Sequence, residues 1–264
     1  MAVNKHEVEQ RFRRSITTYN ANAMVQKAMA VRLNRMVMSS LDYIPKNILE
    51  VGCGTGLFTE ELRRCFKEDE IYVNDIVEEV CSRTARLYQV ITSHCLPGDI
   101  EEIPLPGRFD LIVSAATFQW LNEPKATFRK LSEHLREDGL MIFSTFGKYN
   151  LREIRLTTGG GLRYRTQEEL MGLLEPYFKI EQIREEFRLM EFDDPLALLQ
   201  HLKKTGVNVS GDKRVWTKGK VQEFIDEYNA RFAMDGKVTL TYHPLYLVCR
   251  KKPRIMNTYG VASW

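Results

Sequence analysis

Three glycines follow an apolar strand near residue 50 and can bring the backbone close to a small ligand. Residues 48–56 read Ile-Leu-Glu-Val-Gly-Cys-Gly-Thr-Gly, so Glu50 precedes Gly52, Gly54 and Gly56. Glycine lacks a Cβ atom and adopts positive φ readily, which allows a tight turn and a close approach of backbone to ligand. Nucleotide-binding α/β folds place such a turn after their first strand. The segment predicts a cofactor site, and a strand-to-helix turn that uses glycine only for tightness is the alternative.

The residues after this turn argue against a phosphate ligand. A dinucleotide fingerprint reads G-x-G-x-x-G, and a Walker loop ends in Gly-Lys followed by Ser or Thr. Here Leu57 and Phe58 follow Gly56, so the first pattern fails and the second lacks its lysine. The segment instead resembles the first motif of class I S-adenosylmethionine-dependent methyltransferases. The ligand of that family carries a cationic sulfonium, which needs no phosphate-binding lysine.

An acidic residue stands where a ribose ligand would be needed. Residues 71–75 read as a short β-branched strand that ends in Asp75, just over twenty residues after the glycine turn. Nucleotide-binding folds place a carboxylate there that accepts hydrogen bonds from ribose hydroxyls. A helix N-cap is the other common role of an acid after a strand. The order of the two features favours Asp75 as the ribose ligand.

Two later strand ends complete the expected pocket. Pro97-Gly98-Asp99-Ile100 ends the third strand, and residues 109–114 read as the fourth. The resemblance implies that Asp99 contacts the adenine amino group and that Ile100 packs against the ring. It also implies that the end of the fourth strand, at Ser114, lies beside the methionine part of the cofactor.

Strand-like segments alternate with helical patterns along the chain, which favours a parallel sheet with helices on both faces. The resemblance implies a Rossmann-like α/β fold with a mostly parallel seven-stranded sheet. Two helices carry apolar stripes that we assign to the core: Phe58, Leu62 and Phe66, then Phe128, Leu131 and Leu135 after Pro124. Residues 140–144 read as a fifth strand, and residues 239–242 and 245–249 read as two late strands that turn at Pro244.

The composition favours an enzyme that is neither exported nor embedded in a membrane. The chain has 264 residues with 44% hydrophobic content, enough for one domain with a sizeable core. Five cysteines without a C-x-x-C pair indicate neither a disulfide framework nor a zinc site, and they suit a reducing cytoplasm. The N-terminus lacks an apolar signal core, and no stretch approaches the roughly 18 apolar residues of a membrane span. A net charge of +3 is too small to indicate nucleic-acid binding.

Additional helices are expected between the core strands. Residues 166–169 have capping-box spacing and begin a helix that we assign to the core. Asp194 and Pro195 then mark the start of an inserted helix, and Gly206 marks its end. A second inserted helix is suggested by apolar residues that share one face: Val221, Phe224, Ile225, Tyr228 and Phe232. These two helices predict a cap over the carboxyl ends of the strands, which suits a large or specific substrate.

Basic residues gather in two segments near the predicted cap. Residues 148–165 contain five basic residues and one acid, and residues 201–220 contain six lysines and arginines against Asp212 alone. A solvated basic face is one interpretation. The other is an electropositive rim that steers an acidic partner onto the site.

A narrower resemblance rests on segments outside the cofactor motifs. The most specific is His-Leu-Lys-Lys-Thr-Gly-Val-Asn at residues 201–208. Shorter matches support it: Phe146-Gly147, residues 150–154, Thr158-Gly159, Gly161-Leu162, Tyr164, Glu169-Leu170, and residues 12–15, 19–20 and 25–26. Over nearly its whole length the chain resembles the malonyl-acyl-carrier-protein O-methyltransferase family of biotin synthesis. Residues 253–264 have no counterpart in that family.

The family resemblance implies that the free carboxylate of a malonyl thioester on acyl carrier protein attacks the methyl group of S-adenosylmethionine. Such a carboxylate is ionised at neutral pH, because carboxylic acids have pKa values of about 4. We therefore assign no general base and expect catalysis by positioning. An arginine could hold the carboxylate, and the candidates are Arg152 and Arg155, with Tyr164 as a hydroxyl donor.

The remaining site residues follow from the same resemblance. Tyr19 and Trp120 are expected to close over the cofactor, Tyr19 also positioning the acceptor, while ordinary core packing is the alternative for Trp120. Gln26 and Ile76 are expected to line the cofactor pocket. Acyl carrier protein is acidic, so docking is assigned to basic residues of the cap: Lys203, Lys204, Lys213 and Arg214. No metal is implied.

These features predict one methyltransferase domain over the whole chain, working in the cytoplasm as a monomer. Its expected parts are a helical lid (1–40), a cofactor core (41–190), a helical cap (191–236), the last core strands (237–252) and a tail (253–264). Two alternatives stay open. One is a methyltransferase of another small carboxylic acid or a quinone precursor, and the other is a binding module without turnover. The sequence also leaves open whether coenzyme A can replace the carrier protein.

Overall fold

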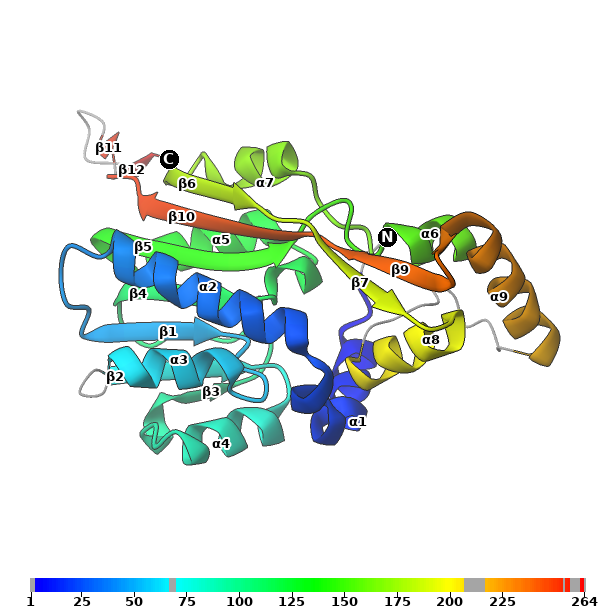
Figure 1. The fold of residues 1–264 in the computed structure, drawn as a ribbon. Helices are drawn as coiled ribbons and strands as arrows, with labels where there is room; N and C mark the ends of the chain where they lie inside the picture. Colours follow the sequence, from blue (N-terminus) through cyan, green and yellow to red (C-terminus); the bar gives the residue numbers. More distant parts are fainter. Residues whose placement is uncertain (1–2, 67–69, 207–216, 254, 257–261, 264) are drawn as a thin grey trace.

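A seven-stranded sheet forms the centre of the molecule (Figure 1). The computed structural model describes residues 3–66, 70–206, 217–253, 255–256 and 262–263. The strands of this sheet are β1 (Asn47–Val51), β2 (Glu70–Asp75), β3 (Cys95–Pro97), β4 (Phe109–Ala115), β5 (Leu135–Phe146), β6 (Phe178–Glu185) and β10 (Pro244–Lys251). Leu135, expected in a helical stripe, is instead the first residue of β5.

The strand order is β3-β2-β1-β4-β5-β10-β6. Strands β1 to β5 pair in parallel, whereas β10 is antiparallel to both β5 and β6. The chain moves outward from β1 to β3 and then returns to β4 on the other side of β1. Open α/β sheets bind ligands at the carboxyl ends of strands where the order reverses in this way. The predicted fold class is confirmed, and the glycine turn after β1 lies at the reversal.

Helices cover both faces of the sheet and bury two apolar layers. One layer lies under α2 (Met24–Ser40), α3 (Leu57–Cys65) and α4 (Glu78–Leu87), and the other under α5 (Pro124–Glu133) and α7 (Gln167–Leu174). The predicted capping box of α7 is present, because the Thr166 hydroxyl accepts from Glu169 N at 3.1 Å and Thr166 N donates to the Glu169 carboxylate at 2.9 Å. Capping fixes where this helix begins against the sheet.

A second, three-stranded sheet leaves the main sheet beyond β6 and β10. It contains β7 (Arg188–Phe192), β8 (Ala233–Met234) and β9 (Lys237–Tyr242) in the order β7-β9-β8. The prediction of a turn at Pro244 is wrong: β9 continues through His243 into β10, and the two strands belong to different sheets (Figure 1). At the point where both strands change sheets, Glu186 N donates to the Pro244 carbonyl at 3.0 Å.

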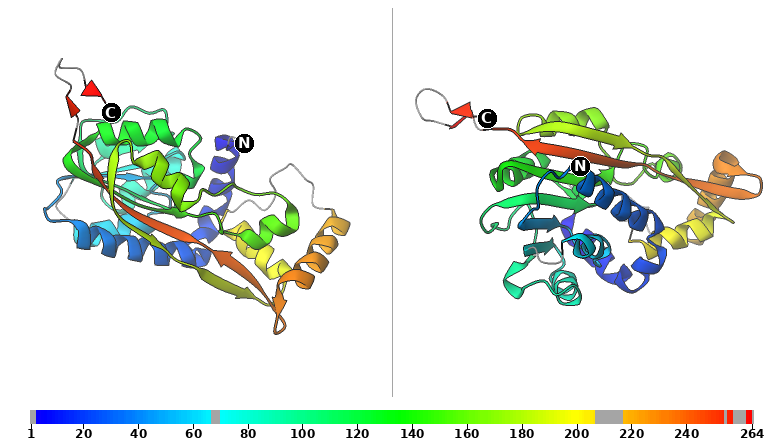
Figure 2. Two further views of the ribbon diagram at one scale, coloured as in Figure 1. Left: turned by 90° about the horizontal axis from the view of Figure 1, so that it is seen from above. Right: turned by 60° about the vertical axis from the view of Figure 1, so that its left-hand side comes forward.

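Two helices sit on this small sheet beyond the carboxyl ends of the core strands (Figure 2). They are α8 (Pro195–Lys204) and α9 (Lys218–Phe232). As predicted, Asp194 caps α8 by accepting from Ala197 N at 2.7 Å, and Gly206 follows the helix with φ of +70°. The cap is thus built from strands as well as helices.

The N-terminal segment crosses the carboxyl ends of the strands before it packs on the sheet. Helix α1 (Lys5–Asn22) lies between the core and α8, and α2 follows directly on the sheet (Figure 1). Helix α6 (Arg152–Thr158) packs against α9 and β9. The shorter elements are η1 (Thr92–His94), η2 (Phe118–Trp120), β11 (Ile255–Met256) and β12 (Ala262–Ser263). Among the described residues, no helix is long and apolar enough to cross a membrane.

Candidate functional site

A pocket lies at the carboxyl ends of β1, β2 and β4, and residues of α1 and of the cap complete its wall. The structure brings most of the predicted site residues to its wall: Tyr19, Gln26, Glu50, Gly52, Gly54, Asp75, Ile76, Asp99, Ile100, Trp120 and Tyr164. These residues come from segments more than a hundred positions apart. The fold therefore brings site residues that were predicted from separate motifs into one pocket.

The glycine turn serves both the pocket and the packing behind it. Gly52 has φ of +73°, and a Cβ atom there would lie 2.1 Å from Thr117 Oγ1, so only glycine fits between these loops. Gly54 lies at the pocket wall, where a Cβ atom would be 3.3 Å from the Phe12 ring of α1. Gly56 is not part of the wall and packs against Tyr88 instead. Gly52 and Gly54 therefore fit the predicted cofactor site. Gly56 fits the alternative, in which glycine only makes the turn tight.

Glu50 places a buried carboxyl group at the inner end of the pocket. It is 1% exposed, and its Oε2 accepts from the Thr59 hydroxyl at 2.7 Å. Burial raises the pKa of Glu50 to about 8, although the Thr59 hydrogen bond opposes the shift. Within the described residues, Glu50 Oε1 and Gln26 Oε1 are buried and have no hydrogen-bond partner. Two unused acceptors on one wall fit a ligand that brings its own donors, such as an ammonium group.

We expect Glu50→Gln to change how the stability of the ligand-free protein depends on pH. The folded-state pKa is raised, so ionisation of Glu50 disfavours folding as the pH rises from about 4.5 to about 8. The variant should match wild type near pH 4, below the unfolded-state pKa of about 4.5. By about pH 9 its free energy of unfolding should exceed that of wild type by roughly 2 to 4 kcal/mol, measured by urea denaturation.

Glu175→Gln provides the control, because this carboxylate is exposed at the end of α7. It should leave the stability difference from wild type equal at both pH values. A Glu50→Gln protein that behaves in the same way would show that Glu50 is ionised without cost in the fold.

Asp75 ends β2 with both carboxylate oxygens fixed by backbone donors. Gly54 N donates to Oδ2 at 2.8 Å, and Val77 N donates to Oδ1 at 2.9 Å. Burial raises the pKa of Asp75 to about 6, although these two hydrogen bonds oppose the shift. Each oxygen keeps further acceptor capacity toward the pocket. The helix α4 that follows has Val77 as its N-cap, so the alternative role as N-cap does not describe Asp75.

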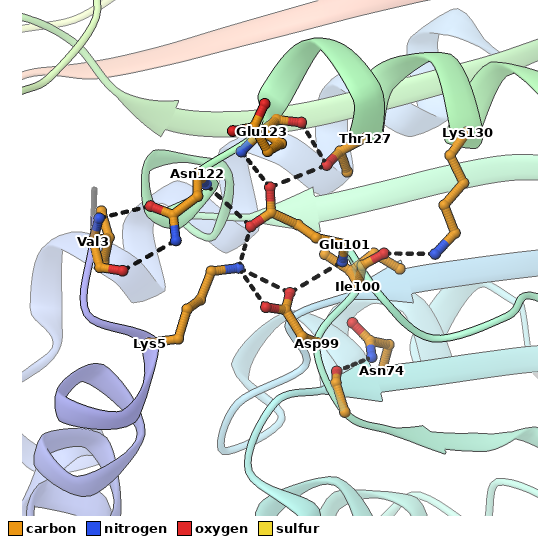
Figure 3. A network of polar contacts seen from close by, with 11 residues as sticks. Val3, Lys5, Asn74, Asp99, Ile100, Glu101, Asn122, Glu123, Thr127 and Lys130 are labelled. Carbon is orange, nitrogen blue, oxygen red and sulfur yellow. Dashed lines mark hydrogen bonds and ion pairs between the residues drawn. The ribbon is translucent and has the colours of Figure 1, made fainter. Parts of the chain in front are cut away.

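The end of the pocket at Asp99 and Ile100 is tied to the N-terminal segment (Figure 3). Lys5 Nζ lies 2.8 Å from both oxygens of Asp99 and 2.5 Å from Glu101 Oε2. Val3 and Asn122 exchange two hydrogen bonds, of 2.6 and 3.0 Å, beside this ion pair. The start of α1 is therefore anchored to the same loop that carries Asp99.

At the cap end, the pocket wall changes from carboxylates to aromatic rings and hydroxyl groups. Tyr19 comes from α1, Tyr164 from the loop before α7, and Tyr242 from the end of β9. Burial raises the pKa of all three phenols, that of Tyr164 to about 12, so they are protonated at neutral pH. Asn150, which is 1% exposed, hydrogen-bonds the Tyr164 hydroxyl. The wall here offers neutral hydrogen-bond donors.

The sequence patterns gave no site role to several residues on this wall, including Lys5, Asn150, Thr205 and Tyr242. Tyr242 read as part of a late core strand. It directly precedes His243 and Pro244, where β9 passes into β10, and this position at the end of a strand is the signal that would have pointed to a site residue. Asn150 and Thr205 stood within family-like segments without an assigned contact.

Some predicted residues lie elsewhere. Ser114 is buried in the sheet, where its hydroxyl donates to the Val51 carbonyl at 2.9 Å, and Ala115 and Ala116 take the place on the pocket wall. Arg152 is 53% exposed and pairs with Glu153 at 3.2 Å. The Arg155 guanidinium lies over the Tyr164 ring, 5.5 Å from the ring centre. Neither arginine belongs to the pocket wall.

Two lysines of the predicted docking surface lie within the described residues, and both are exposed at the end of α8. Lys203 and Lys204 directly precede Thr205 and Gly206, which line the pocket. Lys213 and Arg214 lie outside the described residues.

The pocket carries an excess of negative charge. Four acids line it, Glu9, Glu50, Asp75 and Asp99. Burial raises the pKa of Glu50 to about 8, so the negative charge at neutral pH comes from the other three. Among the residues that the structure describes, Lys5 is the one lysine or arginine on the wall, and it is already paired with Asp99. An acidic, partly buried pocket favours a cationic ligand.

Comparison with known proteins identifies the family of this chain. Residues 23–209 match a family model described as a methyltransferase domain. A malonyl-(acyl-carrier protein) O-methyltransferase of Bacteroides thetaiotaomicron is 36% identical over 262 residues, which covers 95% of this chain and 99% of that protein. The protein of the same name from Haemophilus influenzae is 33% identical and covers 94% of this chain and 95% of its own length.

Solved structures share the fold at much lower identity. The N-methyltransferase NodS of Bradyrhizobium japonicum, in complex with S-adenosyl-L-homocysteine, has a TM-score of 0.56 at 16% identity and covers 94% of this chain and 100% of that one. The YcgJ protein of Bacillus subtilis has a TM-score of 0.60 at 13% identity and covers 84% of this chain and 98% of that one. These likenesses support the fold, and the sequence relatives give the family. The resemblance seen in the sequence is confirmed, and the chain belongs to the malonyl-(acyl-carrier protein) O-methyltransferase family of S-adenosylmethionine-dependent methyltransferases.

Proposed function

We propose that this protein methylates the free carboxylate of a malonyl group carried on acyl carrier protein, the first step toward a pimeloyl chain for biotin. The observation that carries the proposal is the near full-length similarity to relatives of that name. The two-part pocket supports it, because an acidic half suits a cationic methyl donor and a half lined with neutral donors suits a small carboxylate.

The acidic half would hold S-adenosylmethionine, which supplies a methyl group on a positively charged sulfur. Asp75 would accept the ribose hydroxyls, and Asp99 would accept from the adenine amino group. Glu50 and Gln26 would offer their unused oxygens to the ammonium group. The other wall residues would pack around the cofactor: Gly52, Gly54, Ile76, Ile100 and Trp120.

The chain would contribute positioning rather than proton transfer. A malonyl carboxylate is ionised at neutral pH, since carboxylic acids have pKa values of about 4, so no side chain has to remove a proton. Tyr19 and Tyr164 would align the acceptor oxygen with the methyl carbon and the sulfur. Arg155 would hold Tyr164 in place without lining the pocket itself, because its guanidinium packs on Tyr164 and donates to the Asn150 and Lys148 carbonyls. Arg152 has no place in this arrangement.

A direct assay tests the activity. Incubation with labelled S-adenosylmethionine and malonyl-acyl-carrier protein should give a base-labile methyl ester on the carrier. Label found only on free small acids or on a quinone precursor would favour the other methyltransferase interpretation. Cofactor binding without any S-adenosylhomocysteine would indicate a binding module.

We also propose that the exposed end of α8 docks the carrier. Lys203 and Lys204 stand beside the pocket-lining Thr205, and the Thr18 hydroxyl of α1 donates to the Lys204 carbonyl at 3.2 Å. The basic end of α8 is thus held at the acceptor half of the pocket, where an acidic carrier would approach. Lys213 and Arg214 are proposed to extend this surface.

The five cysteines form no disulfide, in keeping with a cytoplasmic protein, which we propose to be a monomer.

We expect Lys203→Glu/Lys204→Glu to raise the KM for malonyl-acyl-carrier protein by about ten-fold or more at low salt, because both charges become repulsive. The affinity for S-adenosylmethionine should not change. Lys125→Glu/Lys179→Glu is the matched control, since it alters the net charge equally at exposed positions on α5 and β6. Equal kinetics of the two double variants, without salt dependence, would remove the docking proposal.

A further inference from the structure

The acceptor half of the pocket lacks a positive side chain among the residues that the structure describes. We infer that the Tyr242 hydroxyl holds the malonyl carboxylate and that His201 positions this hydroxyl. The inference rests on the proposed function, and it replaces an arginine clamp by a neutral donor. Tyr242 lies at the carboxyl end of β9, and His201 lies on α8.

Tyr242 is a buried residue whose polar end meets both the pocket and the cap. It is 1% exposed, and it lines the pocket next to Phe146, with the two ring centres 6.0 Å apart. His201 Nε2 lies 2.8 Å from the Tyr242 hydroxyl oxygen, and the rings meet edge to face at 89°. His201 is itself held by the Phe192 ring, at 5.2 Å between centres. The phenol is therefore held by a side chain that is not itself part of the pocket wall.

The hydrogen-bond roles follow from the protonation states. Burial raises the pKa of Tyr242, so the phenol keeps its proton. Burial and the nearby Lys204 lower the pKa of His201, so the imidazole is neutral at neutral pH and carries one N–H. We assign that hydrogen to Nε2, which then donates to the Tyr242 oxygen. The phenol also shares a hydrogen bond with Thr205 on the pocket wall, and the Thr205 hydroxyl itself donates to the His201 carbonyl at 3.0 Å. The phenol proton therefore points to Thr205 in the ligand-free protein, and the malonyl carboxylate would accept that hydrogen bond in place of Thr205.

A neutral donor suits this reaction better than a guanidinium. The counter-charge of the carboxylate is the sulfonium of the methyl donor, and a bidentate arginine would compete for the oxygen that must attack. A phenol binds one lone pair and leaves the others exposed. In the transfer an O–CH₃ bond forms, the S–CH₃ bond breaks, and its electron pair stays on sulfur. No proton moves, so Tyr242 ends the reaction as it began.

The test compares Tyr242→Phe with Tyr228→Phe. Tyr228 is a second buried cap tyrosine, whose hydroxyl donates to the Thr239 carbonyl at 2.8 Å and which does not line the pocket. Loss of a hydrogen bond to a charged group predicts a fall of about ten- to hundred-fold in kcat/KM for Tyr242→Phe. S-adenosylmethionine affinity should stay within about two-fold by calorimetry. Tyr228→Phe should lower only the Tm.

A binding measurement gives a readout apart from turnover. With S-adenosylhomocysteine present, wild type should bind malonyl-acyl-carrier protein more tightly than acetyl-acyl-carrier protein, which lacks the carboxylate. Tyr242→Phe should lose most of this preference. For His201, the Gln variant keeps a donor near the Nε2 position and should retain the preference, whereas His201→Leu should lose it. Equal losses in the Gln and Leu variants would refute the positioning role.

The outcomes separate this inference from the proposed function. If wild type forms no methyl ester on malonyl-acyl-carrier protein, the proposed function fails, and the inference fails with it. If wild type forms the ester while Tyr242→Phe keeps wild-type kcat/KM and preference, the function stands and the inference alone is wrong. A Tyr242→Phe protein that loses cofactor affinity in the same proportion would also overturn it.

Discussion

Replacing Gly52 with alanine is expected to weaken S-adenosylmethionine binding by about a hundred-fold, a loss in the range of a strained backbone position. The new Cβ atom would lie 2.1 Å from Thr117 Oγ1 and 2.7 Å from Thr117 Cβ, so a rotamer change alone cannot relieve the contact. The φ of +73° is also unfavourable for alanine. The loops that line the cofactor half would have to separate. Isothermal calorimetry on the folded variant measures the loss.

Gly107→Ala isolates the effect of the backbone angle. Gly107 has φ of +60°, and a Cβ atom there would meet nothing within 4 Å. This variant should lose some stability and keep its cofactor affinity. The double variant Gly52→Ala/Thr117→Gly removes the clashing side chain and should recover much of the binding. Equal affinities of Gly52→Ala and Gly107→Ala would show that the close contact with Thr117 has no part in binding.

Asp75→Ala is expected to weaken S-adenosylmethionine binding by more than about a hundred-fold, since two hydrogen bonds to a charged acceptor contribute roughly 3 kcal/mol or more. The effect should depend on pH in wild type. The pKa of Asp75 is raised to about 6, so the carboxylate protonates and cofactor affinity falls as the pH drops below about 6. The Ala variant should lack this dependence. Calorimetry across that pH range checks both expectations.

Asp110→Asn is the matched control, because Asp110 also accepts from two backbone N–H groups, those of Lys46 and Asn47, at 2.8 and 3.0 Å. It lies at the start of β4, away from the pocket. Asp110→Asn should lower stability and leave binding unchanged. Wild-type affinity in Asp75→Ala would rule out the ribose assignment.

The cofactor half of the site was predictable because its residues are defined by local order. Gly52 and Asp99 follow strands and Asp75 ends one, and the carboxyl ends of parallel strands meet at one edge of the sheet. The same reasoning misplaced Ser114, because which side chain of a strand faces the pocket depends on the pleat and not on the strand's end. Its hydroxyl turned toward Val51 on the neighbouring strand.

The acceptor half depends on contacts between distant parts of the chain, which a single sequence does not reveal. Glu153 is 1% exposed and accepts from both Thr241 N and the Thr241 hydroxyl, 88 positions away. These bonds fix how α6 is rotated, and that rotation leaves Arg152 and Arg155 off the pocket wall. The residue next to Thr241 is Tyr242, which the same arrangement brings to the pocket. The position of the two arginines off the pocket wall and the position of Tyr242 on it therefore share one cause.

The cap is a single insertion whose two ends lie side by side, because Glu186 N donates to the Pro244 carbonyl at 3.0 Å. The chain leaves the main sheet at Glu186 and re-enters it at Pro244, so the segment between them begins and ends at neighbouring points of the antiparallel strands β6 and β10. A graft at these two positions would keep every strand of the main sheet, and with them the pocket carboxylates of Asp75 and Asp99, in place. We expect a chimera joined at Glu186 and Pro244 to bind the methyl donor as the parent of its core does. Its preference among acceptors should follow largely the parent of its cap.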